Sequence, residues 1–321
     1  MKTHSSLKQI QVTAHNYVRA ESDFQMKSYI ESFNCFGKFA IGRKPYDVAN
    51  QVTVRGNRDT LYSFGVFDLS SPLTITLPDP KGRYQSLTDI SQDHSIGFVY
   101  GPRKVTLTEE LVGTRYVLLG VRTFADPNDE QDMKAAYLLQ DAVVIEQADI
   151  GKFEVPDWPK DEVEQMREAV NVVSSMATDA SKMLGKKDEL DPVYWMLGAA
   201  LGWGGLPAKA STYLNVFPEK NDGKTAYTLT AKDVPVDAFW SVTVYDDKGW
   251  MPVNKYNAYS FNNVTAKKNK DESVTIHLGG DPKQPNFLPI VPGWNYIVRL
   301  YQPRKEILDG TWAFPNPEPV E

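Results

Sequence analysis

Two polar clusters in this sequence carry residue types that serve ligand binding and proton transfer. The first, GNRDTLYS, places Asn57, Arg58, Asp59 and Tyr62 at the start of an apolar stretch that reads as a strand. A charged group beside such a strand must be solvated or paired, because an uncompensated buried charge is costly. Two interpretations stay open. Either Arg58 and Asp59 pair with other residues and lock a turn, or Arg58 offers a forked donor to an anionic or hydroxylated ligand while Asp59 accepts from it.

The second cluster, RYQSLTDISQDH, holds Arg83, Asp89, Asp93 and His94. Side chains alternate along a strand, so Arg83 and Asp89 share one face, which fits a ligand cavity or a water-facing surface. We predict Asp89, Asp93 and His94 as proton-transfer residues, because imidazole titrates near neutral pH and a nearby carboxylate raises its pKa. Neighbouring side chains on a strand point apart, so pairing Asp93 with His94 requires a bend. Arg83 is grouped with the ligand-binding residues.

A third group lies in the second half of the chain, in VDAFWSVTVYDDKGW. Alternation places Ser241, Thr243 and Tyr245 on one face of the predicted strand, and Trp250 follows the next turn. A wall of hydroxyls and aromatic rings suits sugar or phenolic ligands, with Tyr245 and Trp250 as its aromatic contacts. A solvent-facing strand explains the same pattern.

Motifs with a well-defined chemistry are absent from the sequence. There is no glycine-rich phosphate loop, G-x-S-x-G, H-E-x-x-H or C-x-x-C. Cys35 is the single cysteine, and the histidines are scattered at His4, His15, His94 and His277. We therefore expect no metal, no cofactor and no internal disulfide.

Composition excludes several classes of partner. The chain has 35 Lys and Arg against 41 Asp and Glu, a formal net charge of −6. Nucleic-acid binding needs clustered basic side chains that displace counterions, so we expect no nucleic-acid partner. The sequence has no run of 18 apolar residues and does not begin like a signal peptide. We predict no membrane span. The lack of a signal peptide favours a cytoplasmic location, and the sequence alone leaves the compartment open.

The elements that must position these residues are mainly strands. A helical pattern covers residues 5–33, and seven short alternating segments follow between 50 and 123, beginning with QVTVRG. Three helical stretches come next, and alternation returns after Tyr213. At 321 residues the chain is long enough for two domains. The predicted fold is mainly β with helices, arranged as an N-terminal helix and β sandwich or barrel (1–155), a helical connection (156–205) and a C-terminal jelly-roll-like β sandwich (206–321).

A series of sequence segments along most of the chain carries a family resemblance. These segments are, in order, NRDTLYS, RYQSLTDI, GTRYVLLGVRTF, GWGGLPAKASTY, VPVDAFWSVTVYD and WNYIVRLYQPRKEILDGTW. Together they resemble the bacterial family built from two successive domains of unknown function, those numbered twelve fifty-four and twelve fourteen. The resemblance implies an N-terminal β domain, a helical connection and a C-terminal jelly-roll-like domain, and it implies no established reaction or cofactor. Members often carry secretory leaders, from which this sequence departs by beginning with a polar helix.

Functions of different classes follow from these observations. The first is an enzyme or ligand-processing protein that acts on a small molecule or carbohydrate in a polar, aromatic-lined cleft. The second is a non-enzymatic module that binds a carbohydrate or a protein. The third is a structural or assembly protein that forms a homo-oligomer. Buried carboxylates with perturbed pKa values in a pocket favour the first function, and an exposed row of aromatic rings favours the second.

Overall fold

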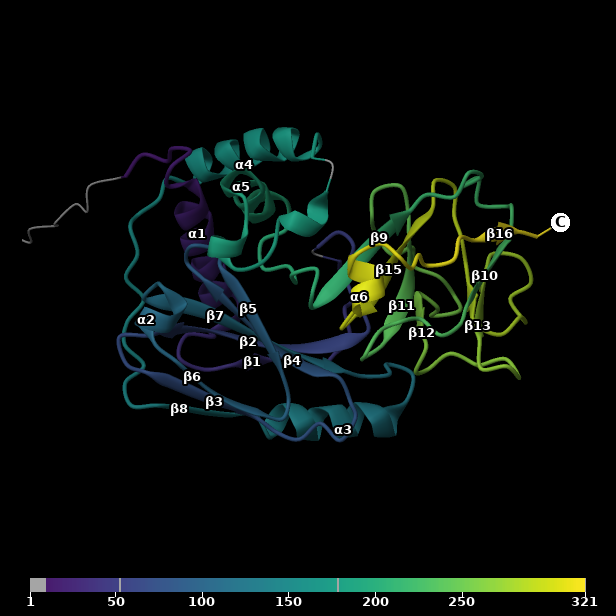
Figure 1. The fold of residues 1–321 in the computed structure, drawn as a ribbon, viewed down its shortest axis with the longest axis horizontal. Helices are drawn as coiled ribbons and strands as arrows, with labels where there is room; N and C mark the ends of the chain where they lie inside the picture. The colour runs from purple at the N-terminus through teal and green to yellow at the C-terminus, as the bar shows by residue number, and fades with distance from the viewer. Residues whose placement is uncertain (1–9, 52, 178, 321) are drawn as a thin grey trace, which may run out of the picture. The chain divides into compact units, whose positions relative to one another are not determined.

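The computed structural model describes residues 10–51, 53–177 and 179–320, which form a mainly β structure with six helices (Figure 1). Most strand pairs are antiparallel, and the described strands close no barrel. The predicted fold class is thus confirmed. The chain forms two compact units. The first unit contains the described residues of Met1–Gly42, Tyr62–Thr123 and Tyr137–Pro207, and the second those of Arg43–Leu61, Phe124–Ala136 and Ala208–Glu321.

The two units are interleaved along the sequence, whereas the predicted domains are continuous. Residues 43–61 belong to the second unit because they hydrogen-bond to its loops. The backbone N–H of Arg55 donates to the carbonyl oxygen of Gly249 at 2.8 Å. The side-chain amide of Gln51 donates to the carbonyl oxygen of Met251 and accepts from its N–H. The prediction that QVTVRG is a strand is therefore wrong for its described residues, which form no backbone-to-backbone ladder with a strand.

The first unit is built on two stacked sheets. The five-stranded sheet has the order β1 (Ala40–Ile41), β2 (Thr60–Asp68), β7 (Tyr116–Phe124), β4 (Gln85–Ser91) and β5 (Ile96–Tyr100). The three-stranded sheet has the order β6 (Arg103–Leu107), β3 (Leu73–Leu77) and β8 (Val144–Gln147). Their inner faces share one apolar core, to which Ile75, Leu87 and Leu119 contribute. The outermost strands β5 and β6 leave this sandwich open along one edge.

Helices cover the other face of the five-stranded sheet (Figure 1). These are α1 (Tyr17–Phe33), α4 (Lys160–Ser174) and α5 (Pro192–Leu201). Met26 of α1 packs in a core with Ile90 and Leu118 of the sheet. The unit also contains α2 (Glu109–Val112) and two short 3₁₀ helices, Ala180–Lys182 and Lys187–Glu189. The helix predicted over residues 5–33 begins at Tyr17, and its first predicted residues lie outside the described part of the chain. Helix α3 (Glu130–Asp141) lies in neither unit alone.

The second unit packs two four-stranded sheets around one core. The first sheet has the order β12 (Ser260–Asn262), β11 (Trp240–Tyr245), β15 (Asn295–Tyr301) and β9 (Ser211–Val216). The second has the order β14 (Phe287–Leu288), β13 (Val274–Leu278), β10 (Tyr227–Ala231) and β16 (Glu318–Pro319), and α6 (Lys305–Leu308) follows β15. Trp240, Val242 and Val244 point into this core, as their alternation predicts. Their neighbours on β11 therefore face the opposite side of the sheet.

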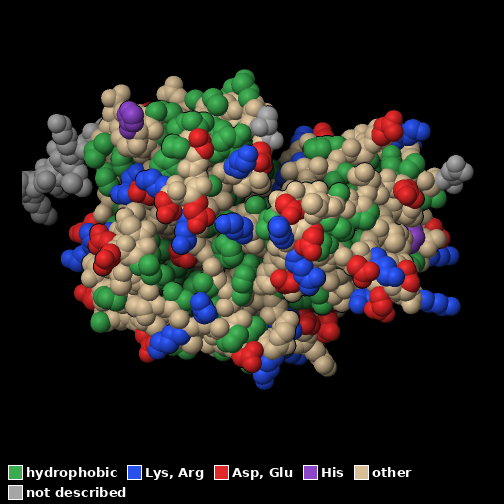
Figure 2. All heavy atoms as spheres, in the orientation of Figure 1, with side chains coloured by type: hydrophobic (Ala, Val, Ile, Leu, Met, Phe, Trp, Pro, Cys, Tyr) green, Lys and Arg blue, Asp and Glu red, His purple; other side chains and the backbone are tan. Residues whose placement is uncertain are grey.

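The surface carries charges of both signs. Figure 2 shows basic and acidic side chains interspersed on the face in view. Among the described residues, no helix combines the length and apolar character that crossing a bilayer requires.

Candidate functional site

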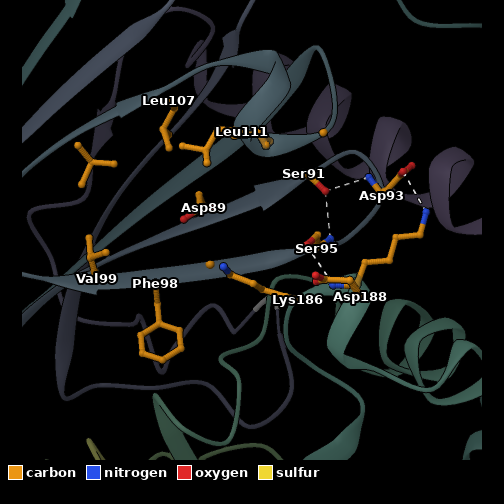
Figure 3. A pocket seen from close by; sticks show the side chains of 15 residues that line it. Asp89, Ser91, Asp93, Ser95, Phe98, Val99, Leu107, Leu111, Lys186 and Asp188 are labelled. Atoms are coloured by element: carbon orange, nitrogen blue, oxygen red, sulfur yellow. Dashed lines mark hydrogen bonds and ion pairs between the residues drawn. The ribbon is translucent and has the colours of Figure 1, made fainter.

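A cavity of about 690 Å³ opens in the first unit where the two sheets end at β5, β6 and α2 (Figure 3). Its apolar wall is formed by Val99, Val105, Leu107, Leu111 and Val112. Its polar side carries Asp89, Ser91, Asp93, Ser95, Lys186, Lys187 and Asp188. Because β5 and β6 are edge strands, the interior of the sandwich is reachable here without parting a sheet. We call this space the Asp89 cavity.

Asp89 lies on β4 and projects into this cavity, on the same strand face as Leu87. Its cross-strand neighbour on β5 is Gly97, where a Cβ would come within 2.6 Å of both carboxylate oxygens. A glycine at this position is thus what makes room for the carboxylate. Burial raises the pKa of Asp89, and the backbone N–H groups of Asp89 and Gly97 and the charge of Lys186 oppose that rise. Lys186 extends into the cavity toward Asp89 (Figure 3).

Asp93 lies at the rim of the same cavity, and two basic side chains hold its carboxylate. Arg19 Nε donates to Oδ1 at 2.8 Å, and Lys187 Nζ donates to Oδ2 at 3.1 Å. Burial raises the pKa of Asp93, but these partners outweigh burial and keep it below its ordinary value. Asp93 is therefore ionised at neutral pH and fixed in position, which suits a structural counter-charge.

His94 faces a different environment from its neighbour Asp93. The chain turns at His94, whose φ is 53°, and the ring stacks on Trp203 with centroids 5.9 Å apart. Nε2 accepts a hydrogen bond from the backbone N–H of Gly204 at 3.1 Å. Burial lowers the pKa of His94 to about 3, so the ring is neutral at pH 7. The bend that an Asp93 and His94 pair requires is present, but it sends the two side chains to different partners.

Two further predicted residues of the first unit lie outside the Asp89 cavity. Arg83 is half-buried in the turn before β4, where its backbone N–H donates to the carbonyl oxygen of Pro80. Tyr62 lies on β2, with the guanidinium carbon of Arg122 5.5 Å from its ring centroid. Neither residue lines the cavity that Asp89 enters.

The remaining predicted residues belong to the second unit, where Asp59 is buried in a polar network. Asp59 is 2% exposed and accepts hydrogen bonds from Ser241 Oγ at 2.6 Å and Ser260 Oγ at 3.3 Å. Burial raises its pKa, against the charge of Arg299 and the bonded hydroxyls. Arg299 is 4% exposed and donates to the hydroxyl oxygen of Tyr245 at 2.7 Å. The hydroxyl and aromatic wall predicted on β11 is thus enclosed by protein.

The neighbours of Asp59 in sequence also bond to protein groups. Asn57 donates to the hydroxyl of Tyr301 at 3.0 Å, and Arg58 Nη1 donates to the carbonyl oxygen of Tyr46 at 3.1 Å. The backbone N–H of Trp250 donates to a carboxylate oxygen in the turn after β11. These contacts give the cluster a structural role, and its contact with a ligand stays a prediction.

The structure adds residues that the sequence analysis missed. Lys186 and Lys187 reach the cavity from a segment, GKKDEL, whose composition is that of a solvated turn, and nothing in its pattern connects it with β4. Within the described part of the chain, no group of three or more His, Cys, Asp or Glu side chains is placed to hold a metal ion. His4 lies outside the described residues.

Comparison with known structures identifies the fold. The crystal structure of the VPA0106 protein from Vibrio parahaemolyticus matches with a TM-score of 0.73 at 20% identity, covering 96% of this chain and 98% of that chain. An uncharacterized protein from Burkholderia cenocepacia matches with a TM-score of 0.51 at 14% identity, covering 96% of this chain and 88% of that chain. At these identities the likeness concerns the fold alone. No curated protein matches this chain.

Comparison with family models confirms the resemblance that the sequence motifs indicated. The model described as "Protein of unknown function (DUF1254)" matches residues 36–95. The model described as "Protein of unknown function (DUF1214)" matches residues 215–305. The two models thus match in tandem along the chain, and both describe domains of unknown function.

Proposed function

We propose that the first unit binds a small molecule with an apolar body and a hydroxyl head group in the Asp89 cavity, where the carboxylate of Asp89 accepts a hydrogen bond from the hydroxyl. One observation carries this proposal: a half-buried carboxylate with a raised pKa lies opposite the Lys186 ammonium in a cavity with an apolar wall. Carboxylates whose pKa is perturbed by burial in a cavity are enriched at functional sites.

The charges around the cavity favour an uncharged head group. A hydroxyl donates to an ionised Asp89 and accepts from Lys186 at the same time. A carboxylate ligand would meet the charge of Asp89, and an amine would meet that of Lys186. The volume of about 690 Å³ suits a small ligand. A carbohydrate is less well matched, because Phe98 points away from Asp89 (Figure 3) and offers no stacking surface beside it.

The same geometry supports proton transfer. A raised carboxylate pKa lies closer to neutral pH, which makes Asp89 a better general base than an exposed aspartate. The Lys186 ammonium would stabilise the negative charge that develops on the ligand oxygen. An enzyme and a binding protein would both bind the hydroxyl compound in this way. They would differ in whether the bound compound is then converted to a product.

Calorimetric titration with 1-hexanol and hexylamine tests the binding step. We expect 1-hexanol to bind and hexylamine to bind at least about tenfold more weakly, since its charge faces Lys186. Asp89→Asn should weaken 1-hexanol binding by about tenfold, because a charge-assisted hydrogen bond becomes a neutral one. The exposed Asp157→Asn is the matched control and should leave the affinity unchanged.

Stability provides an independent readout of Asp89. Its pKa is raised in the folded protein, so ionising Asp89 at neutral pH opposes folding. Asp89→Asn should therefore raise the melting temperature of the free protein at pH 7, and this gain should vanish below about pH 4. Equal affinity of the Asp89→Asn variant and the wild type for 1-hexanol would contradict the proposal.

A further inference from the structure

The strands β4 and β5 present side chains to the Asp89 cavity in successive rows. Alternate residues of a strand share a face, so Leu87 and Ser91 flank Asp89 on the face that it shares with the cavity. On β5, Val99 is the cross-strand neighbour of Leu87, and Gly97 is that of Asp89. Successive rows lie about 7 Å apart, because each residue advances a strand by about 3.4 Å. An apolar row is thus followed by a carboxylate row and then by a row that contains Ser91.

Ser91 and Ser95 form the third row. The backbone N–H of Ser91 donates to the carbonyl oxygen of Ser95 at 3.0 Å, which continues the ladder between β4 and β5. The two residues therefore lie opposite each other, and both line the cavity (Figure 3). Ser91 is only 1% exposed. We call this pair the serine row.

Each hydroxyl of the serine row has a proton to donate. Ser91 Oγ accepts hydrogen bonds from the backbone N–H of Asp93 at 3.2 Å and from that of Ser95 at 3.1 Å. A hydroxyl has two lone pairs and one proton, so these bonds use its lone pairs and leave the proton. Ser95 Oγ accepts from the backbone N–H of Lys187 at 3.1 Å. No described group accepts either hydroxyl proton, so an acceptor on a ligand would remove a cost of burial.

The charges of the cavity favour a neutral acceptor at the serine row. Lys186 and Lys187 are the basic residues that line the cavity. Lys187 Nζ donates to Asp93, and Lys186 extends toward Asp89 (Figure 3). A carboxylate at the serine row would therefore have no cation of its own. A carbonyl oxygen is uncharged and has two lone pairs, which match the two serine protons.

We propose that the ligand of the Asp89 cavity is a neutral 3-hydroxyacyl compound, an ester or a ketone with an alkyl chain. This inference rests on the proposed hydroxyl site at Asp89 and adds a second polar contact to it. The ligand hydroxyl donates to Asp89, and the ligand carbonyl oxygen accepts from the serine row. The alkyl chain lies beside Val99 and the apolar wall that β6 and α2 form.

The spacing of the two rows selects the 3-hydroxyacyl pattern. Hydrogen bonds of about 3 Å that converge from rows about 7 Å apart reach two oxygens roughly 3 to 5 Å from each other. The hydroxyl and carbonyl oxygens of a 3-hydroxyacyl group are joined through three carbon atoms and lie in this range. The apolar row precedes the carboxylate row, so the alkyl chain must extend from the hydroxyl carbon on the side away from the carbonyl.

Calorimetric titration with methyl 3-hydroxyhexanoate, 4-octanol and methyl hexanoate tests this proposal. 4-Octanol has the same chain length and hydroxyl position but no carbonyl, and methyl hexanoate has no hydroxyl. We expect the hydroxy ester to bind at least about threefold more tightly than either, because each of the others lacks one polar contact. Its two enantiomers should differ in affinity, since the chain, the hydroxyl and the carbonyl each meet a fixed part of the cavity.

Variants of the serine row identify the carbonyl contact. Ser91→Ala and Ser95→Ala should each weaken binding of the hydroxy ester by about three- to tenfold and leave that of 4-octanol unchanged. Both serines also accept backbone N–H groups, so the readout is the ratio of the two affinities, which a general loss of stability does not change. Ser91→Thr keeps the hydroxyl and should retain the wild-type ratio. Ser28→Ala, at an exposed serine of α1, is the matched control and should bind both ligands like the wild type.

The outcomes separate this proposal from the hydroxyl site on which it rests. Equal affinity of the wild type for the hydroxy ester and 4-octanol, or serine variants that weaken both alike, would overturn the carbonyl contact. The hydroxyl site would still stand in that case if Asp89→Asn weakened both ligands. If Asp89→Asn changed neither affinity while the serine variants acted on the ester alone, the hydroxyl site and the 3-hydroxyacyl assignment would fall. Failure of every probe to bind would refute both proposals.

Discussion

Asp59 and Arg299 are two nearly fully buried charges of the second unit, and their hydrogen bonds run to protein groups on all sides. Removing one of them leaves the other without its compensating charge. We therefore expect Asp59→Ala to cost about 3 to 5 kcal/mol of unfolding free energy. Urea denaturation followed by circular dichroism measures this loss directly.

The exposed ion pair between Asp237 and Arg304 supplies the control for Asp59. Its side chains are 61% and 54% exposed, so Asp237→Ala should change stability by less than about 1 kcal/mol. If Asp59→Ala instead kept wild-type stability, the network would not be structural. The ligand-binding interpretation of Arg58 and Asp59 would then gain support.

Residue types and alternation predict individual polar positions well and their partners poorly. Asp89 could be singled out because a carboxylate within an apolar strand must face either a cavity or solvent. Lys186 could not, because only the folded chain brings its turn beside β4.

At the scale of elements, Asp68 ties the end of β2 to the segment that precedes β7. Arg115 Nη2 donates to Oδ2 of Asp68 at 2.8 Å, and the backbone N–H groups of Ser70 and Lys152 also donate to this carboxylate. Although burial raises the pKa of Asp68, these donors lower it to about 2. A lowered folded-state pKa stabilises the protein above the unfolded value and loses that effect as pH falls.

We therefore expect Asp68→Asn to cost about 2 kcal/mol at pH 7, a difference that should shrink between about pH 4 and pH 2. Urea midpoints of both proteins measured across this range check the prediction. Glu146→Gln removes an exposed pair with Lys104 and should cost less than about 1 kcal/mol at every pH. A constant difference between Asp68→Asn and the wild type across the range would contradict the assigned pKa.

Sequence periodicity predicts the longer strands better than the short ones. Trp240, Val242 and Val244 alternate clearly, and they enter the core as predicted. QVTVRG alternates too, but its backbone bonds to the Gly249 loop take precedence over sheet pairing. Strands of two residues, such as β14 and β16, form only because a neighbouring strand pairs with them. So short a segment shows no alternation of apolar and polar residues from which a strand could be predicted.

At the scale of the molecule, each unit contains its own apolar cores, but neither unit is continuous in sequence. Segment 43–61 contributes Val48 to a core with Tyr245 and Ile297, and it supplies Asp59 to the polar network. A division of the chain at residue 206 therefore separates the C-terminal sheets from a segment that closes over one of them. Sequence analysis reads contiguous stretches, which explains why it predicted continuous domains.

A fragment of residues 208–321, with residues 124–136 joined to it by a flexible linker, tests this organisation, because of the second unit it lacks segment 43–61 alone. Arg299 would lose Asp59, and Tyr245 would lose the apolar cover of Val48. A buried charge without its partner costs about 3 to 5 kcal/mol, a large part of the roughly 5 to 15 kcal/mol that stabilises a domain. We expect the fragment to show no cooperative melting by circular dichroism. A peptide of residues 43–61 should restore a transition, and the same peptide with Asp59→Ala should restore less of it. Cooperative melting of the fragment alone, near the temperature of the full chain, would instead support a continuous C-terminal domain.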